Sequence, residues 1–187
     1  AESAGALLKP VVLELGGKSP NIVFKDADFD AALNGVASGI FSGTGQSCVA
    51  GSRVFVERSI YESFVSELVK RAKELTLGPP DEESTDLGPL ANFRHRDLIN
   101  SHVTRAKEQG ATVLCGGEIP KTEKLSCGAY YPATVISNVS NRSDISQEEV
   151  FGPVAVVLPF ENEEDLLHQA NDTIYGLASG IWTSDQK

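Results

Sequence analysis

The chain has little of what marks a secreted, membrane-spanning or disulfide-rich protein. Its three cysteines cannot all pair with one another within 187 residues, and a chain of this size without a disulfide framework is typical of a reducing compartment. No apolar run approaches the roughly 18 residues that cross a bilayer. The opening residues lack the charged-then-apolar order of a signal peptide. We therefore expect an untargeted cytoplasmic protein.

Basic residues and metal-ligand patterns are also scarce. Lysine and arginine number 16 against 26 acidic residues, for a net charge of −10. Without a basic cluster, the chain is expected to bind neither nucleic acid nor an anionic membrane surface. His95, His102 and His168 show no metal-ligand spacing, so no metal site is predicted. We expect these histidines on solvated faces of helices.

The length suits one domain with a substantial core, and apolar periodicity alternates between strand and helix along it. Asp26 or Asp28 is expected to cap the first helix, and Ser59 with Glu62 forms a capping box at the second. Such interleaving predicts an α/β three-layer sandwich with a largely parallel sheet. Strands are expected at 11–15, 21–24, 53–57, 111–115, 130–136, 153–160 and 176–183, and helices at 29–41, 59–75, 92–109 and 163–170.

A glycine-rich loop presents Cys48 directly after the first predicted helix. Gly43, Gly45 and Gly51 allow the loop to fold sharply and a ligand to approach its backbone. A backbone N–H at Cys48 could then stabilise the oxyanion that forms when a thiolate attacks a carbonyl. The alternative is that Cys48 is a small buried hydrophobic residue, since free cysteines are among the most buried residue types.

Two acidic positions carry a second kind of chemistry. Glu14 lies in the apolar run 11–15, where a carboxylate requires a partner, a water-filled edge or a raised pKa, and a raised pKa suits a general base. An exposed edge is the alternative. Glu149 and Phe151 precede the apolar strand 153–160. They could accept a sugar hydroxyl and pack on a planar ligand, or be a solvated acid beside a core ring.

Two glycine motifs fail as phosphate sites. Gly16-Gly17-Lys18-Ser19 is similar to the end of a P-loop, but Val12 takes the place of the opening glycine. In the run from Gly43 to Cys48, the cysteine replaces the third glycine of a dinucleotide fingerprint, and the run follows a helix instead of preceding one. No phosphate loop is therefore predicted.

Four segments, in this order and spacing, resemble the signatures of the NAD(P)-dependent aldehyde dehydrogenase superfamily: 14–20, 45–48, 149–153 and 171–178. The resemblance implies a fold of the aldehyde dehydrogenase catalytic-domain type. It also implies that Cys48 is the nucleophile and Glu14 the base that activates the hydrolytic water. Cofactor contacts would come from the Leu15 carbonyl, Glu149 and Phe151, with NAD or NADP as the cofactor and a small-molecule aldehyde as the substrate.

The resemblance further implies that residues 1–187 are a single catalytic domain. The N-terminal cofactor domain and the C-terminal oligomerisation segment of the family are expected to be absent, and the full-length protein is expected to be a homo-oligomer. The isolated chain should then be largely inactive. Two other functions stay open, namely a cofactor-independent cysteine ester hydrolase and a catalytically silent structural or interaction module.

Overall fold

The computed structural model describes residues 1–185 and is built around a six-stranded sheet in the order β3-β4-β5-β2-β1-β6. All neighbouring strands are parallel except β3 and β4, which pair in the antiparallel sense. This confirms the predicted largely parallel sheet. The strands are β1 (Pro20–Val23), β2 (Arg53–Glu57), β3 (Thr112–Cys115), β4 (Thr134–Ser137), β5 (Val154–Phe160) and β6 (Gly180–Trp182).

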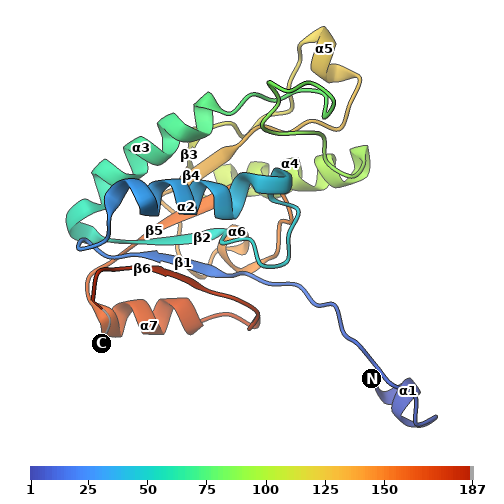
Figure 1. The fold of residues 1–187 in the computed structure, drawn as a ribbon, viewed down its shortest axis with the longest axis horizontal. Coiled ribbons are helices and arrows are strands. Elements are labelled where there is room, and N and C mark those ends of the chain that lie inside the picture. The colour runs from blue at the N-terminus through green and yellow to red at the C-terminus, as the bar shows by residue number, and fades with distance from the viewer. Residues whose placement is uncertain (186–187) are drawn as a thin grey trace.

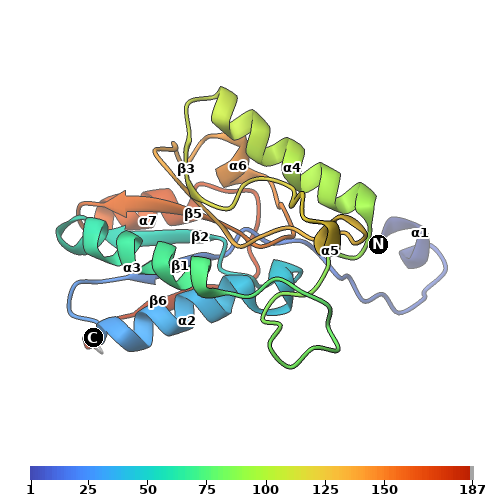
Figure 2. The ribbon, with the colours of Figure 1, turned by 90° about the horizontal axis from the view of Figure 1, so that it is seen from above.

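Helices cover both faces of the sheet, as a three-layer sandwich requires. Figures 1 and 2 show α2 and α3 side by side on one face, and α7 on the other. The α-helices are α1 (Glu2–Gly5), α2 (Phe29–Phe41), α3 (Tyr61–Glu74), α4 (Phe93–Glu108), α5 (Glu123–Ser126), α6 (Asp144–Gln147) and α7 (Glu163–Asn171). Two 3₁₀ turns, η1 (Ser42–Gly45) and η2 (Arg58–Ile60), follow α2 and β2.

Strand alternation divides the core between the two faces. Val54 and Val56 of β2 are fully buried in the cluster that includes α2 and α3. Phe55, between them, is buried on the opposite face with Leu166 of α7. Helix α4 covers the neighbouring part of that face, where it packs on β4 and β5. Successive side chains of a strand point to opposite faces, so β2 is buried on both sides.

The helix starts agree only partly with the predicted caps. Asp28 caps α2 by accepting a hydrogen bond from the backbone N–H of Ala31 at 2.9 Å. The predicted capping box at Ser59 is wrong, because α3 begins after the 3₁₀ turn and has no side-chain cap. The Ser59 hydroxyl instead donates to the Glu57 carboxylate at 3.3 Å. A carboxylate at the end of β2 thus competes for the hydroxyl that would have capped the helix.

The strand predicted at 11–15 is also wrong. This segment has no regular secondary structure and extends away from the body as an arm that ends in α1 (Figure 1). Val12 is 85% exposed and Leu15 64% exposed. No strand of the described residues pairs with the arm, so its β-branched composition has no sheet to join. No helix in residues 1–185 is long and apolar enough to span a membrane.

Candidate functional site

The segments singled out in the sequence meet at the amino-terminal ends of adjacent strands. Residues 16–19 lead into β1, residues 46–52 lead into β2, and residues 148–153 lead into β5. Strands β1, β2 and β5 are neighbours and all run parallel. Their amino ends therefore lie along one edge of the sheet, called the amino edge below. The opposite edge, where these strands end, is called the carboxyl edge.

Two glycines bring the segments of the amino edge into close contact. The backbone N–H of Gly17 donates to Oε1 of Glu149 at 3.1 Å. A side chain at Gly16 would overlap the Glu149 carboxylate, and one at Gly17 would overlap the carbonyl oxygen of Cys48. Residues 16–17 therefore touch both the cysteine loop and the Glu149 loop, and only glycine leaves the necessary space.

The cysteine loop is held in a fixed and unusual conformation. Gly45 has φ +67°, and a side chain there would overlap the carbonyl oxygen of Gly152. Thr44, with φ +59°, is buried, and its hydroxyl donates to the carbonyl oxygen of Gly88 at 3.2 Å. Only a tightly packed surrounding keeps a threonine in this region of backbone space. The loop is thus clamped between residue 88 and the Glu149 loop.

The three cysteines differ in solvent exposure. Cys48 is half-buried, Cys115 is buried at 9% exposure, and Cys127 is exposed. Burial raises the pKa of the Cys115 thiol, which lowers its reactivity because the thiolate is the nucleophile. Cys48 therefore does not lie deep in packed hydrocarbon. No helix begins at Cys48, because the chain turns there and continues into β2.

The structure does not bring Glu14 and Leu15 into a pocket. Both side chains are exposed on the arm, and Glu14 forms no hydrogen bond or ion pair with another described residue. Glu14 nevertheless lies three residues before Gly17, so its Cα is within about 11 Å of the glycine that touches the cysteine loop. The end of the arm at Gly17 thus lies beside Cys48, while residues 11–15 are exposed to solvent.

Glu149 and Phe151 do lie at the amino edge. Glu149 is half-buried, and its hydrogen bond from Gly17 fixes the carboxylate beside residues 16–17. Phe151 is 39% exposed and has a left-handed backbone, with φ +53°. The alternative of a solvated acid beside a core ring is therefore wrong for Phe151, whose ring is substantially exposed.

The fourth sequence motif packs against the first. Leu177 approaches Gly17 so closely that a side chain at this glycine would lie 3.2 Å from a Leu177 methyl group. A cavity of about 530 Å³ lies between the two motifs, and Lys18 and Tyr175 line it. The strand predicted at 176–183 is shorter than expected, because only Gly180–Trp182 pairs with β1.

The sequence did not indicate that two cations near the starts of β1 and β2, Lys18 and Arg53, are buried. The Arg53 guanidinium is fully buried and donates to the Lys18 carbonyl at 2.8 Å, to Asn141 Oδ1 and the Gln169 carbonyl at 3.1 Å, and to the Ala170 carbonyl at 2.8 Å. Burial lowers its pKa to about 10. Lys18 is 2% exposed, and burial followed by the Arg53 charge lowers its pKa to about 7. The Arg53 guanidinium thus ties the start of β1 to α7.

His102 corrects the expectation of solvated histidines. It is 7% exposed on α4, and its Nδ1 accepts a hydrogen bond from Arg105 at 3.0 Å and lies 3.3 Å from Glu148 Oε2. Burial lowers the pKa of His102, and the Glu148 charge opposes that shift. The charged groups around it are Arg105, Lys18, Glu148 and Asp144. No cluster of metal-ligating side chains occurs in residues 1–185.

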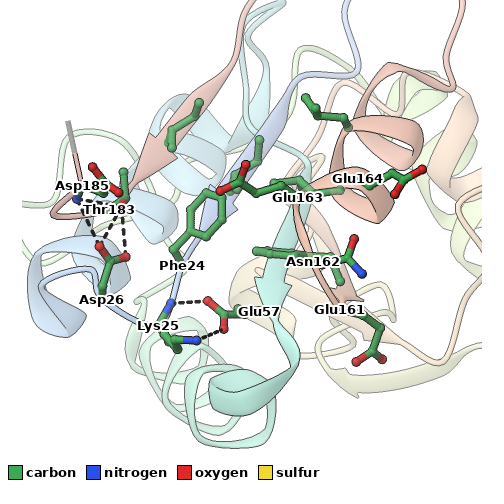
Figure 3. Close-up of a pocket in the computed structure, with 15 residues that line it drawn as sticks. Phe24, Lys25, Asp26, Glu57, Glu161, Asn162, Glu163, Glu164, Thr183 and Asp185 are labelled. Carbon is green, nitrogen blue, oxygen red and sulfur yellow. Dashed lines mark hydrogen bonds and ion pairs between the residues drawn. The ribbon is translucent and has the colours of Figure 1, made fainter. Parts of the chain in front are cut away.

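A larger cavity lies at the carboxyl edge, away from all these residues. It measures about 1110 Å³, with Phe24 and Phe160 among its apolar lining residues and Glu161, Glu163 and Glu164 among its acidic ones (Figure 3). By contrast, the residues between Gly17, Ser47 and Glu149 enclose about 10 Å³, far below the roughly 300–1,000 Å³ of ligand sites. The described residues thus enclose no ligand-sized cavity between Gly17, Ser47 and Glu149.

Comparisons with known proteins identify the family. The model of the aldehyde dehydrogenase family matches residues 1–187. A betaine aldehyde dehydrogenase of Brucella anthropi is 44% identical over 182 residues, which are 97% of this chain and 37% of that protein.

Solved structures agree with this assignment. The NAD+ complex of an aldehyde dehydrogenase from Bacillus cereus has a TM-score of 0.93 at 44% identity and covers 99% of this chain and 37% of that one. A betaine aldehyde dehydrogenase from Staphylococcus aureus in complex with NAD+ has a TM-score of 0.94 at 41% identity, with 98% and 36% covered. The chain thus spans little more than a third of these relatives, and it belongs to the aldehyde dehydrogenase family.

Proposed function

We propose that residues 1–187 are the nucleophile-bearing catalytic domain of an NAD(P)-dependent aldehyde dehydrogenase, which oxidises an aldehyde to a carboxylic acid. The observation that carries the proposal is the contact of Gly17 with both the Cys48 carbonyl and the Glu149 carboxylate. Through it, three motifs that are far apart in sequence meet at one edge of the sheet. The NAD+ complexes among the structural relatives support the cofactor class.

In this proposal Cys48 carries the covalent chemistry. Its thiolate adds to the aldehyde carbon and forms a thiohemiacetal, whose oxyanion accepts a hydrogen bond from the backbone N–H of Cys48. The nicotinamide of the cofactor supplies a hydride acceptor. Loss of hydride from the thiohemiacetal leaves a thioester on Cys48, and half-burial of this sulfur leaves one side open to the substrate.

Glu14 completes the turnover by activating water. Its carboxylate takes a proton from the water that attacks the thioester, and the acid is released with the Cys48 thiolate restored. The exposed position of Glu14 on the arm means that this role requires the arm to be covered by polypeptide beyond the described residues. The same requirement explains why the isolated chain is expected to be largely inactive, since lost positioning costs orders of magnitude in rate.

The residues beside Cys48 fit the nicotinamide half of such a cofactor. Among residues 1–185, the Glu149 carboxylate receives a hydrogen bond only from Gly17, so it keeps lone pairs for the hydroxyls of a ribose. The exposed Phe151 ring offers a flat apolar surface beside it. The carbonyl of Leu15, on the arm next to Gly16, is proposed to accept the carboxamide N–H.

The test compares cysteine variants in the full-length polypeptide that carries these residues. Cys48→Ala should abolish NADH formation from an aldehyde, whereas Cys127→Ala, at an exposed cysteine remote in sequence from the motifs, should leave it unchanged. Glu14→Gln should release about one equivalent of NADH per site and then stall, because the thioester persists. Unchanged steady-state turnover in Cys48→Ala would refute the proposal.

The same variants separate the alternative functions. An ester hydrolase would turn over an activated ester without NAD(P), and Cys48→Ala would abolish that activity. A silent module would show no Cys48-dependent turnover of either substrate. Cys48 forms no hydrogen bond with a histidine among the described residues, so the structure offers no activating base of the kind that cysteine hydrolases use.

A further inference from the structure

Residues 88–95, which end in the first turn of α4, contact both loops of the candidate site, although no motif marks them. Nε2–H of His95 donates a hydrogen bond to the carbonyl oxygen of Phe151, with an N···O distance of 2.7 Å. The two rings lie 6.1 Å apart between centroids, at an angle of 59°. We infer that His95 is a positioning residue that holds Phe151 and the Glu149 loop in their cofactor-binding geometry, an inference that rests on the proposed function.

Phe151 needs such support because its backbone is strained. A bulky residue with φ +53° lies in the left-handed region, which costs of order 1–3 kcal/mol unless the surroundings hold it. Relaxation of this strain changes φ and ψ of Phe151 and so reorients the peptide groups on both sides of it, a change that the His95 hydrogen bond to the Phe151 carbonyl opposes. Gly17 holds the same loop at Glu149 from the other side.

The first turn of α4 is held by a helix cap and by the buried residue that precedes it, so the backbone of His95 has a fixed position. The Asn92 side chain caps the helix by accepting from the backbone N–H of His95 at 2.9 Å. Leu90, just before, is 3% exposed and donates its backbone N–H to the Ala129 carbonyl at 2.9 Å. Because its helix start is fixed to the core, His95 can hold the Phe151 carbonyl in one position relative to the core.

The same segment also holds the cysteine loop. The backbone N–H of Ala91 donates to Oε1 of Gln46 at 2.9 Å, two residues before Cys48. The carbonyl of Gly88 accepts from the Thr44 hydroxyl. Residues 88–95 therefore set the cysteine loop through one end and the Phe151 loop through the other. Loosening of the His95 contact should affect the cofactor side and spare the cysteine side.

The sharpest test replaces His95 in the full-length polypeptide by Gln or Glu, two side chains that are isosteric with each other. Gln keeps an N–H donor for the Phe151 carbonyl, whereas Glu keeps the shape but only accepts. Glu near the N-terminus of a helix is also favourable for folding. His95→Glu should raise the KM for NAD(P) roughly five- to tenfold, the equivalent of one lost hydrogen bond, with little change in the KM for the aldehyde. His95→Gln should restore the wild-type value.

A second readout does not depend on activity. Amide hydrogen exchange in residues 149–152 should accelerate in His95→Glu, by roughly five- to tenfold, and stay at the wild-type rate in His95→Gln. His168→Ala, at an exposed histidine on α7, is the control and should change neither exchange nor KM. Equal exchange in the Gln and Glu variants, or equal KM values for NAD(P), would overturn the role of His95.

Failure of this inference is distinguishable from failure of the proposed function. If Cys48→Ala abolishes NADH formation but the two His95 variants behave alike, only the positioning role is wrong. If Cys48→Ala stays active, the proposed function is wrong, and the exchange rates at 149–152 still decide whether His95 holds the loop.

Discussion

The amino and carboxyl edges of the sheet differ in a way that cavity size does not reveal. In open parallel sheets, ligands usually bind beyond the carboxyl ends of the strands, and a cavity of about 1110 Å³ lies there. The family motifs, however, converge at the amino edge, where a cavity of about 530 Å³ lies between the first and fourth motifs and only about 10 Å³ is enclosed between Gly17, Ser47 and Glu149. Cavity volume and the family motifs therefore point to opposite edges of the sheet.

The two edges also differ in how deeply their charged side chains are buried. At the amino edge, Arg53 is buried and hydrogen-bonded almost entirely to backbone carbonyls. At the carboxyl edge, Arg58 pairs with Glu161 while both side chains stay more than half exposed. Asp26 there accepts hydrogen bonds from the Ser184 and Thr183 side chains, which lower its pKa. The amino edge therefore buries its arginine, whereas the carboxyl edge keeps its charged side chains near solvent.

The largest expected effect comes from replacing Arg53, at the start of β2, and the smaller effect of the pair from replacing Arg58, just after its end. Arg53→Met should lower the free energy of unfolding by roughly 3–5 kcal/mol, because the buried carbonyls lose their donor. Arg58→Met should cost about 0–1 kcal/mol, as is typical of exposed ion pairs. Urea unfolding of both variants measures the difference. Equal losses would show that the edges are held with the same strength.

A smaller effect is expected from two glycines. Gly17→Ala should destabilise the protein by about 1–3 kcal/mol, because the new methyl group meets the Cys48 carbonyl oxygen and forces the backbone apart. Gly176→Ala faces open space and should stay within about 0.5 kcal/mol. Thermal unfolding compares the two. A neutral Gly17→Ala would mean that residues 16–17 do not need their close contact.

The pH dependence of stability should distinguish Lys18 at the amino edge from Lys25 at the carboxyl edge. The pKa of Lys18 is lowered from 10.5 to about 7, so between these values the unfolded chain binds a proton that the native chain lacks. The free energy of unfolding should therefore rise with pH across this window, by at most about 1.4 kcal/mol per pH unit from this group.

Lys18→Met should remove that rise, and urea titrations at several pH values between 7 and 10 would measure it. Lys25→Met is the matched control, because its side chain is 66% exposed and pairs with Glu57, and it should retain the rise. An identical pH profile for Lys18→Met and the wild type would contradict the assignment of this dependence to Lys18.

The smallest effect is expected on the arm that leaves the amino edge. Val12 is 85% exposed, so Val12→Ser should change the free energy of unfolding by less than about 0.5 kcal/mol. A loss above about 1 kcal/mol in urea unfolding would show that the arm packs on the body.

Sequence patterns predicted the body of the fold well, because its signals are local. The alternation in 53–57 and the apolar stripe of α4 follow from periods of two and 3.6 residues. The strand at 11–15 failed for a non-local reason, since a β-branched run becomes a strand only where another strand can pair with it. His102 failed similarly, because Lys18, Asp144 and Glu148, which act on it in the folded chain, are remote from it in sequence.

The sequence indicated the candidate site residues but not the residues that hold them in position. Glycine spacing and family resemblance indicated Cys48, Glu149 and Phe151. The donors and acceptors that hold them are remote in sequence: Arg53 binds carbonyls at 169–170, and His95 binds the carbonyl of residue 151. Backbone carbonyls leave no signature in a sequence, so such contacts become visible only in the folded chain.

The central claim is that the amino edge carries the nucleophile, and a trapped intermediate tests it most directly. The Glu14→Gln variant of the full-length polypeptide is mixed with NAD(P) and an aldehyde, digested, and analysed by mass spectrometry. The account predicts the mass of the acyl group on the peptide containing Cys48 and on no peptide containing Cys115 or Cys127. NADH formation with no acyl adduct on Cys48, or with the adduct on another cysteine, would contradict it.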